Sequence, residues 1–599
     1  MPTTVFQELR RGGAFLVAAA APQEIFTPAE LTDDQKLIGQ TTEEFVAKEV
    51  VPHIPELEKH KEGVLPELLK KAGEIGLLGG LIPEAYGGAQ LDKISTTVLA
   101  EKLAVYASIA VAHGAHSGIG SIPLVYFGTE EQKKKYLPKM ATGEWLACYC
   151  LSEPQAGSDA LASRTRAVLS PDGKSWILNG QKMWITNGGF ADVFTIFAKV
   201  DGEKFSCFII ERGTPGFSVG AEENKMGIRG SSTVPLFFEN ATIPKENLLH
   251  EIGRGHIVAF NTLNAGRFSL GAYCLGGAKK AIENSAKYAK ERVAFGKPIA
   301  QFGLIQAKLG EMTIRTLALE SMIYRTAGMI ESAVSSASAG SASDQSKAAM
   351  QTLEEYAIES SISKVAGSEI LDYCVDEGVQ IFGGYGFHED YPMARAYRDS
   401  RINRIFEGTN EINRMLIIQM LMKRAMTGVL PLIAAAKKLA DEILAGPSFD
   451  EGPKGDFAAE QQSVAQAKKA FLLASGAAVQ KFGDKLAEQE EVVGALANIV
   501  IDIYAMESSL LRAEKAAEAK STSASLMADA ARAYIYDVTD RVEKEARTAL
   551  AGVEEGDSLA TQLAVLRRFT KHSPVNVIAL RRRVAESVLS QQKYPFEGR

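Results

Sequence analysis

The chain of 599 residues is too long for a single hydrophobic core, and its length predicts roughly three to five domains. Hydrophobic residues make up 46% of the chain and charged residues 23%, which is typical of globular proteins. The formal net charge of -7 argues against a general nucleic-acid-binding protein, because that class carries a surplus of basic residues.

The N-terminal region has two interpretations. Arg10 and Arg11 precede the apolar run Gly12–Ala21, an arrangement that resembles a signal peptide. The run is short and rich in alanine, and Pro22-Gln23-Glu24 is a poor cleavage site, so we favour an ordinary N-terminal helix. No stretch approaches the ~20 strongly apolar residues that a membrane-spanning helix needs. We therefore expect a cytoplasmic protein.

Residues 1–145 are predicted to form an N-terminal α-helical domain. Leu65, Leu68, Leu69 and Ala72 recur at the spacing of one helix face. The segment 83–88 holds proline and two glycines and predicts a break between helices.

Residues 146–258 have a different pattern and predict a middle β domain. Short runs of β-branched and aromatic residues, such as Val193–Phe197 and Phe205–Ile210, alternate with turn pairs such as Asp172-Gly173 and Asn187-Gly188. Long helical patterns return over residues 259–426. Within them, Ser332–Ser346 is rich in Ser, Ala and Gly and predicts a flexible loop between helices.

The C-terminal quarter of the chain is predicted to be a separate helical unit. Residues 427–456 are interpreted as a linker, because Gly446–Pro453 is rich in glycine and proline. Residues 457–599 predict an α-helical extension domain without a recognisable chemical motif. An apolar face beside Lys437 and Lys438 is formed by Val429, Leu430, Leu432, Ile433, Leu439, Ile443 and Leu444.

The five cysteines are odd in number and scattered along the chain. Cys148 and Cys150 lie two positions apart, without the CxxC spacing of a metal or redox pair. We expect reduced thiols and predict no metal site.

Three segments contain residue types that a flavin site needs, namely backbone amides, an aromatic wall and a close approach by glycine. They are Cys148–Asp159, Lys182–Gly189 and Ile405–Glu411. No GxGxxG follows a strand in the first domain, which excludes a Rossmann-type site there. Each segment alone has an ordinary interpretation, since a strand Trp usually lies in a core and a Glu before Gly usually lies in a solvated turn.

Taken together and in this order, the segments resemble the acyl-CoA dehydrogenase family over about residues 30–425. Further matching pieces are Lys225–Ser231, Asn264–Arg267, Glu291–Lys297 and Gln380–Gly386. The resemblance implies a mainly α fold with a central β domain: an N-terminal α-helical domain, a β-barrel-like middle domain and a C-terminal four-helix bundle. Residues 457–599 look like the extra helical domain of the very-long-chain subgroup.

The resemblance also implies the site, residue by residue. Glu407 matches the catalytic base of the family. FAD contacts are implied for Tyr149, Cys150, Leu151, Ser152, Gly157, Ser158, Trp184, Ile185, Thr186, Thr409 and Asn410. Further FAD contacts are implied for Arg292, Phe295, Gln380, Ile381, Phe382, Gly383 and Gly384. The contacts of the Gln380–Gly384 segment are expected to come from a neighbouring subunit. Acyl-CoA contacts are implied for Ser158, Asn264, Arg267 (near the nucleotide end), Phe406 and Gly408.

The implied reaction is the α,β-dehydrogenation of a fatty acyl-CoA to trans-2-enoyl-CoA, the first step of fatty acid β-oxidation. Burial is expected to raise the pKa of Glu407 so that it can take the α-proton, while the Glu407 N–H stabilises the enolate. Electrons are expected to pass to an electron-transfer flavoprotein. The alternatives are an acyl-CoA oxidase, which passes electrons to oxygen, and a non-catalytic binding or assembly protein on the same scaffold.

Three further expectations concern the size of the substrate and the partners. The small-residue stretch Gly114–Gly120 predicts a deep cavity for long acyl chains, although close helix packing is the alternative. The extension is expected to cover the surface that other members use to form tetramers, which predicts a homodimer. The apolar face after Val429, with the basic residues Arg567, Arg568, Lys571, Arg581, Arg582 and Arg583, predicts peripheral membrane contact; packing and ion pairing are the alternative.

Overall fold

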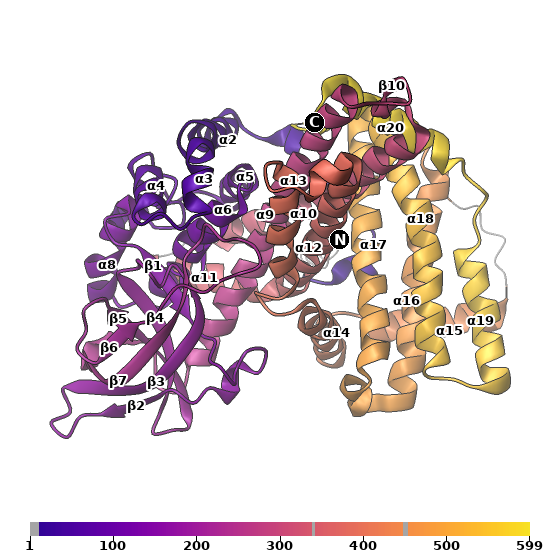
Figure 1. Cartoon of the computed structure of the whole chain (residues 1–599). Helices are drawn as coiled ribbons and strands as arrows, with labels where there is room; N and C mark the ends of the chain where they lie inside the picture. The colour runs from indigo at the N-terminus through magenta and orange to yellow at the C-terminus, as the bar shows by residue number, and fades with distance from the viewer. Residues whose placement is uncertain (1–10, 338–341, 447–452, 599) are drawn as a thin grey trace.

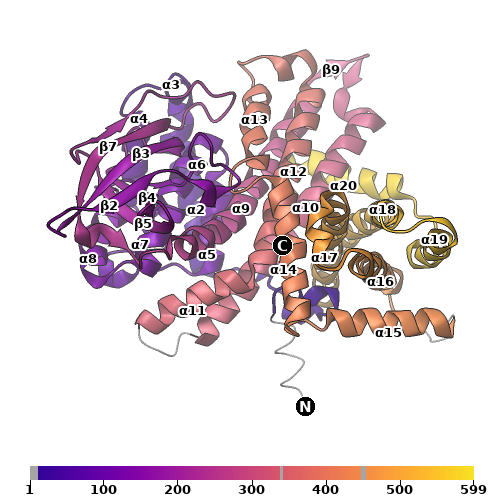
Figure 2. The ribbon, with the colours of Figure 1, turned by 90° about the horizontal axis from the view of Figure 1, so that it is seen from below.

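A computed structural model describes residues 11–337, 342–446 and 453–598. Figure 1 shows the β domain at one end, the N-terminal helices beside it, and long helices through the centre of the molecule. The C-terminal extension lies on the other side of those central helices, as Figure 2 also shows. The expected order of helical domain, sheet domain, helical domain and helical extension is therefore present.

The N-terminal domain consists of short helices packed around a leucine-rich core. Its α-helices are α2 (Asp33–Phe45), α3 (Ile54–Leu57), α4 (Val64–Glu74), α5 (Lys93–Leu103), α6 (Ala107–His113), α7 (Ile122–Phe127) and α8 (Glu130–Thr142). Thr32 and Thr129 begin α2 and α8 with capping boxes, in which each threonine hydroxyl accepts a hydrogen bond from the N–H three residues later. A π-helical turn, η7 (Gly114–Gly118), continues α6.

The middle domain is built around an eight-stranded sheet in the order β6-β7-β3-β2-β4-β5-β8, with β1 pairing with β4. Its strands are β1 (Ala147–Cys150), β2 (Arg166–Leu169), β3 (Ser175–Thr186), β4 (Val193–Val200), β5 (Lys204–Glu211), β6 (Phe217–Val219), β7 (Thr233–Pro244) and β8 (Leu248–Leu249). The β3–β7 register shifts between Lys182 and Ile185, which marks an irregularity in β3.

The central helices are long and closely packed. They are α9 (Gly255–Glu291), α10 (Gly303–Ala337), α11 (Ala342–Glu355), α12 (Ala357–Phe382), α13 (Pro392–Ser400) and α14 (Asn410–Met426). Gly271 and Gly367 allow α9 and α12 to approach, since a Cβ on Gly367 would lie 3.1 Å from the Gly271 Cα. The predicted loop 332–346 was too long: α10 and α11 occupy most of it, and 338–341 lie outside the described residues. Ser and Ala are compatible with both states, so local composition could not decide.

The extension consists of α15 (Leu432–Ala445), α16 (Ala458–Phe482), α17 (Glu490–Glu518), α18 (Ala524–Ala551), α19 (Gly556–Thr570) and α20 (Val577–Gln591). Helix α15 lies within the segment interpreted as a linker, beside α16. Among the described residues, α17 is the helix whose length and composition would suit a membrane span. Because 83% of its most apolar window is buried inside the protein, it resembles a core helix of a globular domain.

The apolar N-terminal run is packed into the molecule as a 3-10 turn, η1 (Ala14–Leu16), and not as the predicted longer helix. The Gly13 N–H donates to Glu359 Oε1 on α12 at 2.7 Å, and the Phe15 ring lies 4.7 Å from the Tyr504 ring on α17. The run thus joins the central helices to the extension.

Candidate active site

The predicted base, Glu407, lies in a tight turn between η12 (Arg401–Arg404) and α14. Its φ is +59° and that of Gly408 is +79°, so two successive residues have left-handed backbones. Thr409 then begins α14, with its hydroxyl accepting from the Ile412 N–H at 3.2 Å. A non-glycine residue in the left-handed region carries backbone strain, which surrounding contacts must hold in place.

Two side chains from neighbouring helices hold this turn. The Asn413 amide donates to Gly408 O at 2.9 Å and to Thr409 O at 3.0 Å. Arg267 Nε, from α9, donates to Glu407 O at 3.2 Å. Sequence reasoning missed Asn413; the available signal was its place one helical turn after the capping Thr409.

The Glu407 carboxylate lies against α9 at Gly266, where an added Cβ would be 2.6 Å from Oε2. That oxygen is buried and has no hydrogen-bond partner among the described residues. Burial raises the pKa of Glu407 to about 7, although Arg267 and Lys364 act in the opposite direction. A carboxyl group with this pKa is suited to accepting a proton near neutral pH.

A cavity of about 120 Å³ begins at Glu407 and has mainly apolar walls. Phe406 and Thr186 line this cavity together with Glu407. Small residues of η7 and one edge of α5 also line the cavity: Gly114, Ala115, Gly118, Thr96, Leu99 and Ala100.

A second cavity, of about 260 Å³, lies further along α9 and shares Val111, Leu270 and Tyr273 with the first. Tyr273 stands between them, with its hydroxyl 3.2 Å from His113 Nδ1. Burial lowers the pKa of His113 to about 4, so this contact is between neutral groups near pH 7. Sequence reasoning did not single out Tyr273 or His113, because both lie in ordinary helical patterns.

The two predicted cofactor segments of the sheet are joined by their backbones. The Met183 N–H, in β3, donates to Ser152 O at 3.0 Å. A buried ion pair supports the junction, because Lys182 Nζ lies 2.7 Å from Glu153 Oε1 and 3.2 Å from Leu151 O. Trp184 follows at the irregularity of β3, with a φ of +62° and 58% of its surface exposed. The adjacent Ile185 is buried.

Strand alternation separates the side chains of β1. Tyr149 and Leu151 face the packing between the sheet and the helices, whereas Cys148 and Cys150 face the core of the sheet. The Cys148 and Cys150 sulfur atoms lie 3.6 Å apart in that core. Cys150 can therefore contact a ligand only through its backbone. The predicted FAD contact of Cys150 is thus limited to its backbone atoms. Gly157 and Ser158 are exposed in the turn beyond the strand.

Two other predicted contact residues have buried side chains. Arg267 was expected near the nucleotide end of CoA, but its guanidinium is buried and donates to Asn264 Oδ1 at 2.9 Å as well as to Glu407 O. The Asn410 side chain is also buried, and it accepts from Lys364 Nζ at 2.6 Å. Both groups serve the helix packing behind the turn, which a linear motif does not reveal.

The remaining predicted FAD residues form a separate cluster. Arg292, Ile381, Phe382, Gly383 and Gly384 line a cavity of about 490 Å³ at the end of α12. No residue is common to this cavity and the one at Glu407. The nearby Gln380 and Phe295 are exposed, Phe295 to 95%.

Four models of acyl-CoA dehydrogenase domains match the chain: the N-terminal domain over residues 32–144, the middle domain over 148–241, and C-terminal domains over 253–422 and 466–568. A probable acyl-CoA dehydrogenase of Bacillus subtilis (strain 168) is 47% identical over 588 residues, which cover 98% of this chain and 99% of the relative. The mitochondrial very long-chain specific acyl-CoA dehydrogenase of Bos taurus is 34% identical over 535 residues, 84% of this chain and 78% of the relative.

Among solved structures, the chain is similar to an acyl-CoA dehydrogenase from Bacillus anthracis that was crystallised in complex with FAD. The TM-score is 0.96 at 48% sequence identity, with 98% of this chain and 99% of the other covered. The similarity extends over the dehydrogenase body and the helical extension together.

Proposed function

This chain belongs to the acyl-CoA dehydrogenase family, and from that premise we propose that it oxidises long-chain acyl-CoA thioesters to trans-2-enoyl-CoA with FAD as its cofactor. The observation that carries the proposal is Glu407, whose buried carboxylate oxygen has no hydrogen-bond partner among the described residues and faces an apolar cavity.

The predicted FAD residues on β1, on β3 and in the turn after β1 suit a flat, hydrogen-bonding ring. Trp184 exposes its indole beside the joined strand ends, and Ser152, Ser158 and Thr186 add hydroxyl groups nearby in the sequence. We assign FAD binding to these residues with Tyr149, Leu151, Gly157, Ile185 and Thr409, and to the backbones of Cys150 and Asn410. When bound, FAD supplies the oxidant that accepts the β-hydrogen and two electrons of the acyl chain.

The protein's own part in the reaction is proton transfer and alignment. Glu407 takes the α-proton, for which its raised pKa is suited. Within the described part of the chain, the Glu407 N–H donates to no protein acceptor, so it is free to stabilise the developing negative charge on the thioester oxygen. Phe406 and Gly408 flank the base and shape the cavity around the thioester.

The decisive test is anaerobic mixing of the purified, FAD-loaded protein with palmitoyl-CoA. Bleaching of the flavin absorbance is expected, with trans-2-hexadecenoyl-CoA as the product. A yellow protein that no acyl-CoA bleaches would contradict catalysis and favour the binding or assembly alternative. Fast reoxidation of the bleached enzyme by oxygen would instead favour an acyl-CoA oxidase over transfer to an electron-transfer flavoprotein.

The two neighbouring cavities, which share Val111, Leu270 and Tyr273 as wall residues, support the preference for long chains. Helix α9 runs past both, and its rise of about 1.5 Å per residue places Gly277, in the second cavity, about 16 Å beyond Gly266. An extended alkyl chain advances about 1.3 Å per carbon, given C–C bonds of about 1.5 Å, so that distance corresponds to about twelve carbons. A kcat/KM maximum at butyryl-CoA or hexanoyl-CoA would contradict this preference.

A homodimer is the proposed assembly. The cavity at Glu407 and the cavity lined by Arg292 and Gly383 have no residue in common within one chain, which suits a cofactor held between two subunits. Exposed Phe295 and Phe387, at 95% and 87%, lie near the second of these cavities and suit a subunit contact. Helices α17, α18 and α20 pack on α10 and cover part of the central bundle. A tetramer mass in light scattering would contradict the proposal.

Peripheral membrane contact is proposed for α15 alone. Ile433 and Leu444 are exposed on it, at 52% and 86%. The predicted basic patch is weaker than expected, because Arg581 Nε lies 2.8 Å from Glu311 and Arg583 Nε lies 2.6 Å from Asp529. We propose a cytoplasmic enzyme that visits anionic membranes through this helix. Equal sedimentation of the native protein and an Ile433→Ser, Leu444→Ser variant with anionic vesicles would contradict it.

A further inference from the structure

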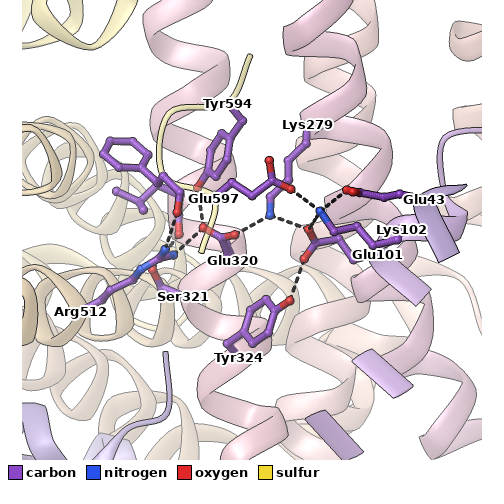
Figure 3. Close-up of polar contacts among 12 residues, drawn as sticks. Glu43, Glu101, Lys102, Lys279, Glu320, Ser321, Tyr324, Arg512, Tyr594 and Glu597 are labelled. Carbon is purple, nitrogen blue, oxygen red and sulfur yellow. Dashed lines mark hydrogen bonds and ion pairs between the residues drawn. The ribbon is translucent and has the colours of Figure 1, made fainter. Parts of the chain in front are cut away.

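A chain of buried charges links the dehydrogenase body to the extension. Lys279 Nζ, on α9, lies 2.7 Å from Glu101 Oε1 on α5 and 2.5 Å from Glu320 Oε1 on α10. Arg512 Nη1, on α17, lies 2.6 Å from Glu320 Oε2. Figure 3 shows the four side chains side by side, and each is almost fully buried. Charges in such surroundings are stable only while each has its partner.

The C-terminal tail, Tyr594–Glu597, covers one side of these buried ion pairs (Figure 3). The Tyr594 hydroxyl donates to Glu320 Oε2 at 2.7 Å, and the Lys279 ammonium lies 4.9 Å from the Tyr594 ring centre. Arg512 Nη2 donates to the Phe596 carbonyl at 3.4 Å. Tyr594 and Phe596 are both buried, so the tail separates the charges from water.

The last contact of the tail is with α5. Glu597 forms an ion pair with Lys102, the residue that follows Glu101. Lys102 is also paired with Glu43 of α2, at 2.6 Å. The two ion-pair partners of Lys102 come from different parts of the protein. Glu43 belongs to the same helical domain as α5, whereas Glu597 lies in the C-terminal tail.

Helix α5 stands between this charged cluster and the cavity at Glu407. Glu101 and Lys102 face the cluster, while Thr96, Leu99 and Ala100 line the cavity. A shift of α5 toward or away from α9 would therefore change the width of the cavity where the acyl chain lies.

We propose that the C-terminal tail is a specificity-determining element, which positions α5 as a wall of the acyl cavity through Lys102 and the Glu320–Lys279–Glu101 chain. The inference rests on the proposed acyl-CoA dehydrogenase activity. It assigns a role in substrate selection to residues that touch neither substrate nor cofactor, so Tyr594 and Glu597 are positioning residues.

The test uses two mild substitutions in the full chain, Glu597→Gln and Tyr594→Phe, with Glu43→Gln as the matched control. For each FAD-loaded protein, kcat and KM are measured from butyryl-CoA to stearoyl-CoA. In the two tail variants the ratio of long-chain to short-chain kcat/KM is expected to change by about three- to tenfold, the size typical of coupling between neighbouring groups. The change is expected in KM, with flavin content and the control's ratio unchanged.

Equal loss of kcat/KM at every chain length, or an unchanged ratio, would overturn the inference and leave the tail a purely stabilising element. Hydrogen exchange of the α5 amides in the same proteins gives a readout that needs no activity. Faster exchange in the tail variants than in the control supports the positioning role, and equal exchange overturns it. An inactive native enzyme would contradict the proposed function, and the exchange result would still decide about the tail.

Discussion

Glu407 and Glu320 both have a buried carboxylate oxygen beside α9, yet their acidities are shifted in opposite directions. Burial raises the pKa of Glu407 to about 7, since Oε2 has no hydrogen-bond partner among the described residues. Burial acts in the same direction on Glu320, but Arg512 and Lys279 outweigh it and lower the pKa of Glu320 below its usual value. The number of donors that reach the carboxylate, and not burial alone, decides which form is stable.

The cations near Glu407 explain the difference. Arg267 is close, but its guanidinium donates to the Glu407 carbonyl and to Asn264. Lys364 is also close, but its ammonium donates to Asn410. Each acts on the Glu407 carboxylate only through its charge, without a hydrogen bond. An under-compensated buried acid is typical of a catalytic site, whereas a fully paired one is typical of a structural contact.

The largest effect is expected on the rate of flavin bleaching when Glu407, but not Glu320, is replaced by Gln. Glu407→Gln removes the base while keeping the size of the side chain, so the rate of flavin bleaching by acyl-CoA should fall by about 10²–10⁴-fold. Flavin content and thermal stability should stay close to those of the native protein. Stopped-flow absorbance measures the rate, and Glu320→Gln serves as the control that retains the base. Near-native bleaching by the Glu407→Gln variant would mean that another group takes the proton.

The second prediction concerns Glu320, whose ion pair with Arg512 is removed. Arg512→Met leaves Glu320 buried without its guanidinium, and loss of one partner from such a pair typically costs about 3–5 kcal/mol. Calorimetry should show a lower melting temperature for the variant at pH 7. Because the folded-state pKa of Glu320 is lowered, its stabilisation is present above the unfolded value of about 4.3 and is lost as the pH falls below it. The gap between the two proteins should therefore narrow in acid; a gap that widens there would contradict the ion-pair account.

The third prediction concerns the strain of the catalytic turn. Asn413→Leu removes the amide donor from the Gly408 and Thr409 carbonyls, and a buried group left unsatisfied costs about 1–3 kcal/mol. We expect kcat to fall by about tenfold with little change in FAD content, because the base stays present but is less well oriented. Asn498→Leu, which removes a hydrogen bond to Arg414 but leaves the donor of the Gly408 and Thr409 carbonyls in place, is the control. Equal loss in both variants would point to general destabilisation.

The smallest effect is the dependence on pH. Glu407 must be ionised to accept the α-proton, so kcat/KM should rise with pH and level off above about 7, falling about tenfold per unit below that value. The contribution of Glu407 to stability has the opposite sign. A carboxyl with a raised folded-state pKa stabilises the fold fully below its unfolded value of about 4.3, and this is lost as the pH rises through 7. A flat kcat/KM profile between pH 5.5 and 8 would exclude Glu407 as the titrating base.

The order of the domains and the position of the proposed base could be read from the sequence, because both depend on local signals. Amphipathic spacing indicates helices such as α4, and short β-branched runs between turn pairs indicate the sheet. The residues around Glu407 keep their order in the chain, so a motif reveals them. The extents of α10 and α11 were not predictable in the same way, since Ser and Ala allow either helix or loop.

Other features were decided only by the tertiary structure, because they depend on contacts between residues far apart in the chain. Strand alternation turned Cys150 away from the site, and helix packing buried Arg267 beside the catalytic turn. The ion pairs of Arg581 and Arg583 weakened a predicted basic patch of six residues. The sequence by itself determined which chemical groups the protein has and on which elements they lie. Their acidity was decided by the fold, since desolvation and pairing exist only after the helices have packed.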